Sequence, residues 1–189
     1  WDVGIEQGLW KGAKLKAIYF RNNLNDLIYS QKVKDNYELR INVGKAVSKG
    51  FELEAEQWLW RQLRFFANFT YTNAKIRKNE AKPELEGKKL KFVPERMFNV
   101  GVEFERGPFS ASLIGRYVSK RYGTDDNRDR VNSVYTSYDP YFVADAKISY
   151  RVTKNASLSF SVNNIFNRQY FEYYKAPGRS WFGELTLKF

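Results

Sequence analysis

The sequence predicts an all-β chain, an antiparallel meander of about nine long strands that forms part of a transmembrane β-barrel. Apolar and polar residues alternate along most of the chain with the period of two that is typical of strands. No stretch approaches the ~18 apolar residues that a membrane helix needs, so a role in a membrane requires strands. Tight turns and long loops alternate along the chain, as they do in outer-membrane barrels.

Composition excludes several classes of site. The 189 residues suit one domain, 17% of them are aromatic, and both cysteine and histidine are absent. Absence of cysteine rules out a disulfide framework and thiolate metal sites, and absence of histidine removes the commonest metal ligand and general base. We therefore expect no enzyme activity, no cofactor and no metal. Residue 1 is a tryptophan in a strand-like pattern, without signal-peptide features, which predicts that the chain is the tail piece of a longer precursor.

The first half of the chain is expected to hold four strands. In the second of them, Leu15, Ala17 and Tyr19 alternate with lysines, and Gly44 and Gly50 in the third predict bulges or close backbone approach. Tight turns are expected near residues 11 and 61, and longer loops near Lys34-Asp35-Asn36 and over residues 76–92. The expected strands cover residues 1–10, 13–29, 39–58 and 63–71.

The second half repeats this scheme, with turns near residues 107 and 154 and long loops near residues 130 and 175. Polar extensions such as RNNLNDLIYS and NNIFNRQYFEYY predict strands that outrun the ~5 to 6 residues of globular strands and project beyond the membrane. Residues 78–88 form a loop tip that we expect to tolerate shortening. The expected strands of this half cover residues 98–104, 109–117, 144–152 and 156–162, followed by the final strand.

The two faces of the last six strands differ in charge. One set of alternating positions is apolar throughout and carries no charge, whereas the other includes Arg64, Glu103, Arg116 and Asp145. Lipid demands this division, because a lysine or arginine facing the bilayer midplane costs about 2 to 4 kcal/mol. Leu113 is thus expected to face lipid and Ser112 the lumen. The short turns assign their end of the sheet, and Phe189, to the periplasmic side.

The end of the chain carries a family resemblance. Gly178 and Arg179 precede a final strand in which one face consists of Trp181, Gly183, Leu185, Leu187 and Phe189. This end resembles that of TonB-dependent outer-membrane receptors, whose 22-stranded barrels close on such a strand. Residues 42–54, 89–104 and 158–170 are similar to segments of the same family. The resemblance implies that the row ending at Phe189 is an assembly signal, read by the barrel assembly machinery.

The resemblance also implies a function and a location. Such receptors perform energy-coupled uptake of a scarce nutrient, a ferric siderophore being our first expectation, across the outer membrane of Gram-negative cells. Residues 1–189 would be the C-terminal portion of the barrel, without the plug domain. TonB and the plug would be partners of the full-length receptor only, so we do not expect the fragment to transport by itself.

Two clusters of acidic residues suggest catalytic or metal-binding roles. Glu52, Glu54 and Glu56 share one strand face and resemble paired catalytic carboxylates or ligands for a hard metal. The favoured interpretation makes them lumen-wall residues that meet basic partners on neighbouring strands. Asp125, Asp126 and Asp129 suggest a Ca²⁺ loop, but their spacing fits no EF-hand and Arg128 lies among them.

The net charge of +11 does not predict a nucleic-acid partner, because the cations are spread over turns and loops without a basic helix. Lys78, Lys82 and Lys88 belong instead to one external loop that could attract anionic lipopolysaccharide or an anionic iron chelate, or could be merely solvated. Tyr173 and Tyr174, with Tyr170 and Phe171, form either a ligand-stacking cluster or, more often for such positions, an interfacial girdle.

Two other function classes remain open from the sequence: a passive porin or adhesin-type barrel, and a soluble carbohydrate-binding β-sandwich. A plug sequence upstream would exclude the first, and strands of ordinary length would favour the second. An odd number of strands leaves the first and last strands running in the same direction. We therefore expect an open sheet whose edges pair with another copy or with missing strands, rather than a closed monomeric barrel.

Overall fold

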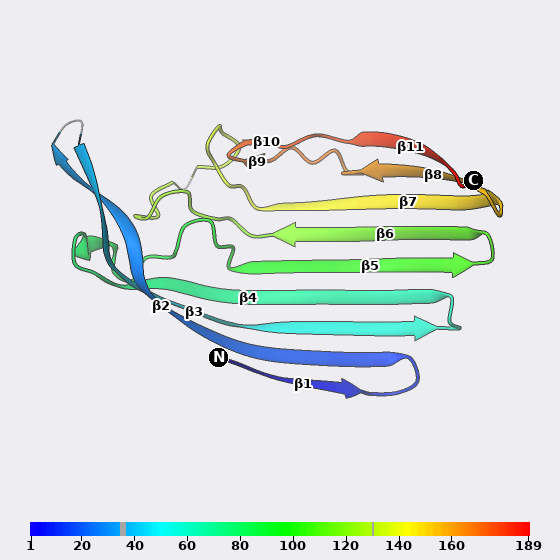
Figure 1. Cartoon of the computed structure of the whole chain (residues 1–189), viewed down its shortest axis with the longest axis horizontal. Helices are drawn as coiled ribbons and strands as arrows, with labels where there is room; N and C mark the ends of the chain where they lie inside the picture. The colour runs from blue at the N-terminus through cyan, green and yellow to red at the C-terminus, as the bar shows by residue number, and fades with distance from the viewer. Residues whose placement is uncertain (35–36, 130) are drawn as a thin grey trace.

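The computed structural model describes residues 1–34, 37–129 and 131–189, which form one curved sheet with loops gathered at one end (Figure 1). Its strands are β1 (Asp2–Gly8), β2 (Ala13–Lys34), β3 (Tyr37–Leu59), β4 (Leu63–Asn79), β5 (Arg96–Arg106), β6 (Phe109–Val118), β7 (Tyr141–Thr153), β8 (Ala156–Asn163), β9 (Phe171–Glu172), β10 (Tyr174–Lys175) and β11 (Ser180–Leu187), with a 3₁₀ turn, η1, at Pro83–Leu85. Within the described ranges, no helix is long and apolar enough to cross a membrane.

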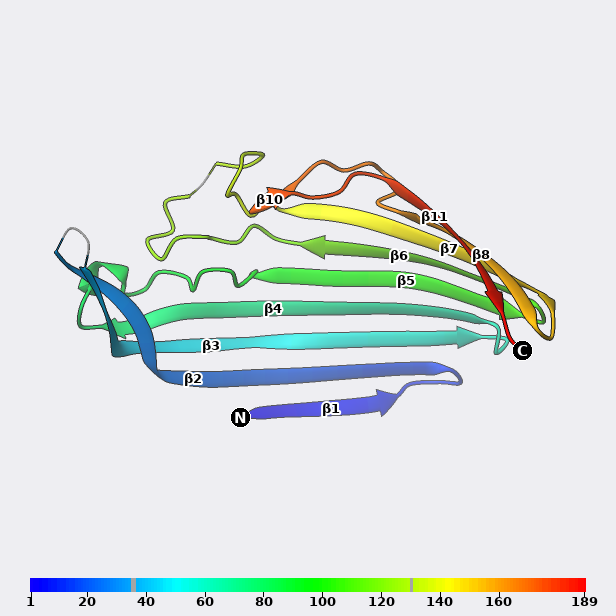
Figure 2. The same cartoon turned by 45° about the horizontal axis from the view of Figure 1, so that its top comes forward.

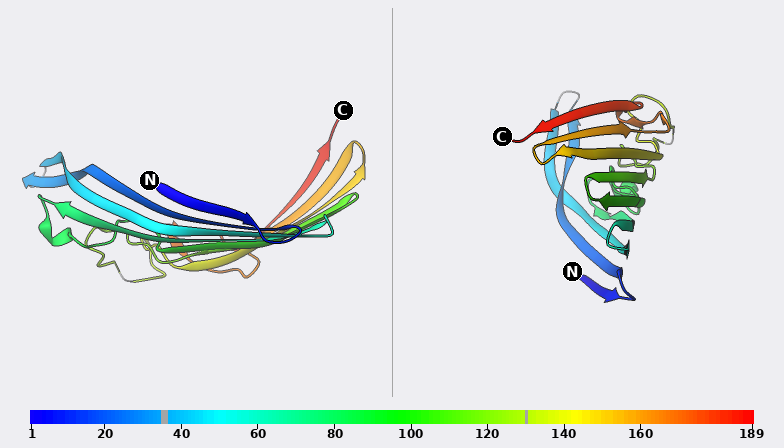
Figure 3. Two further views of the ribbon diagram at one scale, coloured as in Figure 1. Left: turned by 90° about the horizontal axis from the view of Figure 1, so that it is seen from below. Right: turned by 90° about the vertical axis from the view of Figure 1, so that its right-hand side faces the viewer.

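The sheet is an open meander. Nine strands follow the order β1-β2-β3-β4-β5-β6-β7-β8-β11, and every neighbouring pair is antiparallel. The strands β9 and β10 form a separate small hairpin. The edge strands β1 and β11 run in the same direction and lie at opposite borders of the curved sheet (Figures 1 and 3). The expected meander and the open sheet are confirmed, while pairing of the edges with another chain stays a prediction.

The two ends of the sheet differ, as the connections predict. Tight turns link β1 to β2, β3 to β4, β5 to β6 and β7 to β8, and the chain terminus Phe189 lies at this short-turn end (Figures 1 and 2). The other, long-loop end carries the connections 80–95, 119–140 and 164–179. The centre of the loop expected near Lys34-Asp35-Asn36 lies outside the described residues.

Strand register places the predicted apolar rows on one face. Leu113 lies opposite Val102 on β5 and Ala146 on β7, and Ala146 lies opposite Val162 on β8. Val162 in turn lies opposite Trp181 on β11. The side chain of Leu113 is 46% exposed, although it occupies the middle of the sheet. We call this the apolar face; so much exposed apolar surface requires an apolar surrounding.

The opposite, charged face is held by ion pairs between strands. Glu54 approaches Lys16 at 3.3 Å, and Arg64 bridges Glu56 at 2.7 Å and Glu103 at 2.9 Å. This confirms the lumen-wall interpretation of Glu54 and Glu56, because each carboxylate already meets a cation from a neighbouring strand. A lumen-facing wall keeps such groups hydrated, which lipid would not do.

An aromatic belt crosses the apolar face near the long-loop end. Trp1 packs on Tyr19 with ring centroids 5.5 Å apart, and Phe51 stacks on Tyr71 at the same separation. On β4 the row from Tyr71 to Leu63 covers eight residue steps, or about 26 Å at ~3.3 Å per residue. That length matches the apolar band of about 25 Å between the aromatic girdles of membrane barrels.

One of the two predicted strand extensions is confirmed. The extension RNNLNDLIYS does continue β2, with a bulge where Asp26 takes a φ of 57° between the register positions of Leu24 and Leu27. The extension NNIFNRQYFEYY does not continue β8 and contains only the short strand β9 and the start of β10, so that prediction was wrong. Strand β8 ends at Asn163, and Asn164 and Asn167 turn the chain with positive φ values of 50° and 51°. Asparagine tolerates this backbone region better than most residues do.

The two glycines singled out in β3 have distinct reasons. A Cβ at Gly50 would stand 1.8 Å from the backbone oxygen of Tyr71, so only glycine allows β4 to approach so closely. Gly44 lies opposite Leu27 at the irregular part of the β2–β3 pairing. Both the close approach and the irregularity were expected.

Candidate functional site in the long loops

Three connections join into one assembly at the long-loop end. The side chain of Asn127 in loop 119–140 binds the backbone of Lys89 in loop 80–95. Its Oδ1 accepts from the Lys89 backbone N–H at 2.7 Å, and its Nδ2 donates to the Lys89 carbonyl at 3.0 Å. The backbone N–H of Phe92 also donates to the carbonyl of Tyr122 at 2.8 Å. Loop 119–140 therefore lies between loop 80–95 and the last connection, 164–179, which it contacts through a second set of bonds.

Asp139 makes this second junction. Its side chain, in a residue only 2% exposed, accepts hydrogen bonds from the backbone N–H of Ser133 at 2.9 Å, the Ser137 hydroxyl at 2.8 Å and the backbone N–H of Phe171 at 2.9 Å. Hydrogen bonds to an ionised acceptor are roughly twice as strong as neutral ones. One carboxylate thus fastens loop 119–140 to hairpin β9–β10.

The family motif Gly178-Arg179 packs against the turn after β8. Asn167 accepts a hydrogen bond from the backbone N–H of Arg179 at 3.0 Å, and a Cβ on Gly178 would stand 2.7 Å from the same Asn167 oxygen. Asn164, which is buried, donates to the carbonyl of Arg168 and accepts from its backbone N–H. A side chain at position 178 would therefore displace the Asn167 carboxamide, which accepts the hydrogen bond from Arg179.

Connection 164–179 folds over the charged face. Tyr170 stacks on Tyr141 with ring centroids 4.0 Å apart, inside a buried cluster with Val118 and Val143. The register pairs Val118 with Tyr141, on the face opposite to Leu113. Burial raises the pKa of the Tyr170 phenol. The interfacial-girdle interpretation of Tyr170 is thus wrong, because its ring lies on the lumen side and seals the base of the loops.

Four tyrosines form a cluster above this base. Tyr135 contacts Tyr173 and Tyr174 with centroids 5.4 Å and 5.5 Å apart, and Tyr138 lies 6.3 Å from Tyr173. Tyr174 remains 65% exposed. A hydrogen bond with Tyr174 raises the pKa of the Tyr135 phenol. This tyrosine cluster offers aromatic faces and hydroxyl donors at the loop surface.

The basic loop is partly neutralised and firmly packed. Lys78 pairs with Glu80 at 2.5 Å, the Lys82 backbone N–H donates to Asn79, and Lys88 is exposed. These lysines lie at the end of β4 and in loop 80–95, whereas the tyrosine cluster is built from loop 119–140 and connection 164–179. Leu85 is buried against Ile76, so residues 78–88 are not a free loop tip, and their tolerance to shortening stays a prediction.

The aspartates of loop 119–140 act as local hydrogen-bond acceptors. Asp125 pairs with Lys91 at 3.3 Å, Asp126 accepts from Thr124, and Asp129 accepts from the backbone N–H of Gly123. In the part of the chain that the structure describes, no three acidic residues are grouped so that they could hold a metal ion. Asp126 and Asp129 share the Thr124 hydroxyl, whereas Asp125 is held by Lys91, so the three carboxylates do not form a Ca²⁺ site.

The row proposed as an assembly signal lies along the free edge of the sheet. Trp181 stacks on Phe160 of β8 at 5.7 Å, and Leu185 is 61% exposed on the apolar face. Gly183 has no neighbour within 4 Å of an added Cβ, so open space surrounds it. Leu187 and Phe189 complete the row at the short-turn end. Recognition of this row by assembly machinery stays a prediction.

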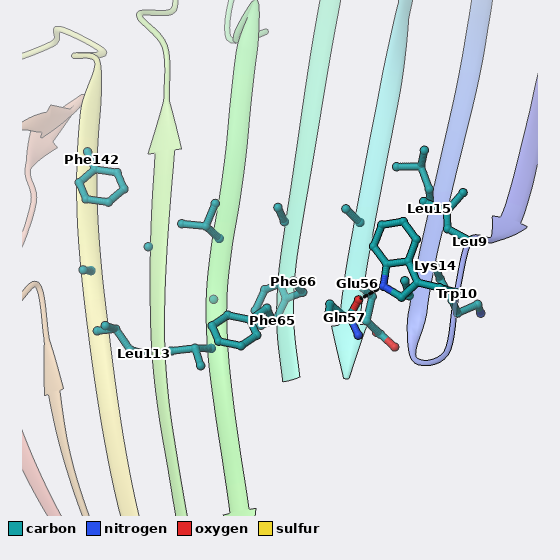
Figure 4. Close-up of a pocket in the computed structure, with 18 of the residues that line it drawn as sticks. Leu9, Trp10, Lys14, Leu15, Glu56, Gln57, Phe65, Phe66, Leu113 and Phe142 are labelled. Atoms are coloured by element: carbon teal, nitrogen blue, oxygen red, sulfur yellow. Dashed lines mark hydrogen bonds between the residues drawn. The ribbon is translucent and has the colours of Figure 1, made fainter. Parts of the chain in front are cut away.

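An apolar hollow lies on the apolar face of the sheet, away from the long loops. It measures about 610 Å³ and crosses the strands where Ala55, Ala67 and Gly115 leave room between larger neighbours. Figure 4 shows Leu113 and Phe142 on its far side from Trp10, whose indole N–H donates to Gln57 at 2.7 Å. Because its lining is apolar and it opens on the membrane-facing side, it suits lipid chains better than a polar substrate.

No sequence pattern indicated two central residues of the loop assembly. Asp139 and Tyr135 lie in a stretch without periodicity, and the residues that join them to connection 164–179, such as Phe171 and Tyr173, lie more than thirty positions away in the chain. Asn167 offered a weak signal, because a run of asparagines after a strand is typical of turns.

Comparisons with known proteins give the family context. A family model described as TonB dependent receptor-like, beta-barrel, matches residues 1–165. The ferric-pyoverdine M114 receptor PbuA of Pseudomonas sp. (strain M114) is 25% identical over 193 residues, covering 97% of this chain and 22% of that protein. The metal-pseudopaline receptor CntO of Pseudomonas aeruginosa (strain UCBPP-PA14) is 31% identical over 158 residues, covering 77% of this chain and 21% of that protein.

A solved structure shares the fold. The unliganded ferric citrate transporter FecA matches with a TM-score of 0.81 at 22% identity, covering 100% of this chain and 31% of that one. At this identity the likeness shows the fold alone. The present chain spans about a fifth of the length of PbuA and CntO, 22% and 21% respectively.

Proposed function

This chain belongs to the TonB-dependent receptor-like β-barrel family, and from that premise we propose that it forms wall and loops of an outer-membrane uptake receptor. The family consists of transport receptors of the Gram-negative outer membrane and not of enzymes. The main support for the proposal is the difference between the two faces of the nine-stranded sheet. One face is exposed and free of charge, and the other carries ion pairs between neighbouring strands. Lipid on one side and a hydrated lumen on the other account for that division.

In this proposal, residues 1–189 are the C-terminal portion of a 22-stranded barrel. The fit of Gly178 and Arg179 against Asn167, and the apolar row of β11, support that position. The plug and TonB would act with the chain only in a full-length receptor, whose remaining strands would pair with β1 and β11. The barrel assembly machinery would read the row that ends at Phe189.

The transported substrate is proposed to be a metal chelate, with a ferric siderophore first. The names of PbuA and CntO give those relatives a ferric-pyoverdine and a metal-pseudopaline substrate. The tyrosine cluster supports an aromatic or anionic chelate here, since it presents aromatic rings and hydroxyl groups at the loop surface and Tyr174 is open to solvent. Lys78, Lys82 and Lys88 would add positive potential at the same end of the sheet.

The test is uptake under iron limitation. A strain whose only receptor gene of this type encodes the full-length receptor that contains this chain should accumulate an iron-55-labelled siderophore, and disruption of TonB should abolish accumulation. Replacing Tyr135 and Tyr174 together by alanine should raise the half-saturating concentration at least about fivefold, because loss of a contact residue typically costs ~1 kcal/mol or more. Tyr150→Ala, on the apolar face at the short-turn end, is the matched control.

Uptake should be scored per molecule of receptor in the outer membrane. Accumulation that persists without TonB would favour a passive porin or adhesin-type barrel and contradict this proposal. The soluble β-sandwich is already excluded, because the nine principal strands form a single sheet and the family is one of membrane barrels.

A further inference from the structure

The apolar face changes character just above its aromatic belt. The register aligns Tyr19, Phe51, Tyr71 and Arg96 across β2 to β5, so Arg96 stands in the belt itself. One step farther toward the loops on the same face, Arg21 lies directly opposite Lys49. Apolar side chains thus give way to cations within two residues along β2 and β3.

Two more cations lie still farther toward the long loops on the same face. Lys75 continues the row of Tyr71 on β4, and it lies directly opposite Lys89 in an isolated antiparallel bridge. We call Arg21, Lys49, Lys75, Lys89 and Arg96 the cationic patch. With ~3.3 Å per residue and ~4.8 Å between strands, the patch covers roughly 14 Å by 14 Å over β2 to β5.

The pairing inside this patch is unfavourable as it stands. Arg21 opposite Lys49, and Lys75 opposite Lys89, are like charges at facing positions, which destabilise a sheet. The charged face does the reverse, since Arg64 there lies opposite Glu103. Such facing cations are explained if an anion from outside the chain lies between them.

Little within the described chain offsets these charges. Glu95 is the carboxylate at the patch, and Lys89 holds it at 2.5 Å and lowers its pKa. Among the described residues, Arg21, Lys49, Lys75 and Arg96 form no ion pair; Arg21 reaches only Asn23, at 3.5 Å. Five cations and one carboxylate leave a clear excess of positive charge.

We propose that the cationic patch binds the phosphorylated headgroup of an outer-leaflet glycolipid, while its acyl chains lie on the apolar face below. The position of the cationic patch on the sheet favours a lipid headgroup as its partner. The patch lies on the face that meets lipid, at the height where headgroups begin above an aromatic belt, and not on the lumen side where a transported chelate would pass. Guanidinium and ammonium groups are suited to phosphate. A free phosphate would gain nothing from the adjoining apolar rows.

The inference rests on the proposed placement in the outer membrane, and binding of purified lipopolysaccharide tests it. The full-length protein in mild detergent is titrated with lipopolysaccharide, and bound lipid is counted by native mass spectrometry. The triple variant Arg21→Gln, Lys49→Gln, Lys75→Gln should bind about ten- to a hundredfold more weakly, since each cation near an anionic lipid contributes ~1 kcal/mol and 1.4 kcal/mol is tenfold.

A second triple variant, Lys11→Gln, Arg61→Gln, Lys154→Gln, removes the same charge from the exposed short-turn end and should bind within about twofold of the parent. Equal losses in both triple variants would overturn the proposal, because general charge would then explain binding. Two ligand arms identify the chemistry. Lipopolysaccharide stripped of its lipid phosphates should bind as weakly as the patch variant does, and unchanged binding would refute a phosphate site. Inorganic phosphate at equal concentration should not compete; full competition would make the site one for free phosphate.

The outcome is separable from the transport proposal, because binding is measured without uptake. If the parent protein binds lipopolysaccharide through the patch but accumulates no chelate, the transport proposal is contradicted and the lipid-binding proposal is supported. If the parent transports a chelate while both triple variants bind the lipid equally well, the transport proposal is supported and the lipid-binding proposal is contradicted.

Discussion

Replacing Leu113 by arginine should prevent stable insertion of the barrel, and the structure explains why this position is decisive. Leu113 lies at the middle of β6, four residues from Phe109 toward the short turns and four from Tyr117 toward the long loops. At ~3.3 Å per residue, each aromatic is about 13 Å away along the strand. Its neighbours across the sheet, Val102 and Ala146, offer no charge or hydrogen-bond partner.

The magnitude follows from depth in the bilayer. An arginine that faces lipid at the midplane costs about 2 to 4 kcal/mol, and the central position of Leu113 favours the upper value. That cost lowers the ratio of folded to unfolded protein by roughly 30- to 900-fold. Snorkelling gives little relief, because a path of about 13 Å to either belt exceeds the reach of one side chain.

Ser112→Arg is the matched control, one residue away. Ser112 lies on the charged face opposite Glu103 and Lys147, so a new guanidinium would meet water and a carboxylate. Both variants of the full-length protein are folded into lipid vesicles across a urea series and followed by tryptophan fluorescence. Leu113→Arg should shift the midpoint strongly and Ser112→Arg only slightly. Equal shifts would refute the assignment of the two faces.

Other consequences are simpler to state. Deleting Phe189 should lower the outer-membrane level of the full-length protein, as measured by heat-modifiable migration of extracted membranes, and normal levels would remove the assembly-signal role. Asp139→Ala should leave the sheet intact but open loops 119–140 and 164–179 to limited proteolysis, since three donors lose one acceptor and each such bond is worth about 1.5–3 kcal/mol; unchanged cleavage would mean that the junction is held elsewhere. Leu85→Ala should loosen loop 80–95 in hydrogen exchange, whereas exposed Glu84→Ala should not. The Lys89–Glu95 pair depresses the pKa of Glu95, so its stabilising effect is full above the ordinary carboxyl pKa and is lost as pH falls through the depressed value; an acid titration of exchange in the same loop should show loosening only at that low pH.

The membrane-spanning part of the fold was predictable because lipid imposes a strict rule on every strand. Leu113, Ala146 and Trp181 could be assigned to one face from alternation alone, and the register confirms each assignment. A residue exposed to lipid depends little on which strand is its neighbour. Local sequence therefore carries the information that the fold needs there.

The loops were less predictable because their contacts are not local. Leu85 was expected in a dispensable tip, yet it is buried against Ile76 and Leu90. Tyr170 was interpreted as part of a girdle, yet it turns inward to stack on Tyr141. In both cases an apolar residue in a polar stretch found a partner that no periodicity indicates. The same holds for the tyrosine cluster, which draws on two connections.

The most direct test of the account is an accessibility scan along β6 in lipid vesicles. The chain has no cysteine, so single cysteines can be introduced from Ser110 to Ile114 and spin-labelled without a competing native thiol in this chain. Labels at Ala111 and Leu113 should collide with oxygen dissolved in the bilayer, and labels at Ser110, Ser112 and Ile114 with a water-soluble nickel chelate. This alternation with a period of two is the predicted result. Contact with the nickel chelate at all five positions would contradict a lipid-facing wall.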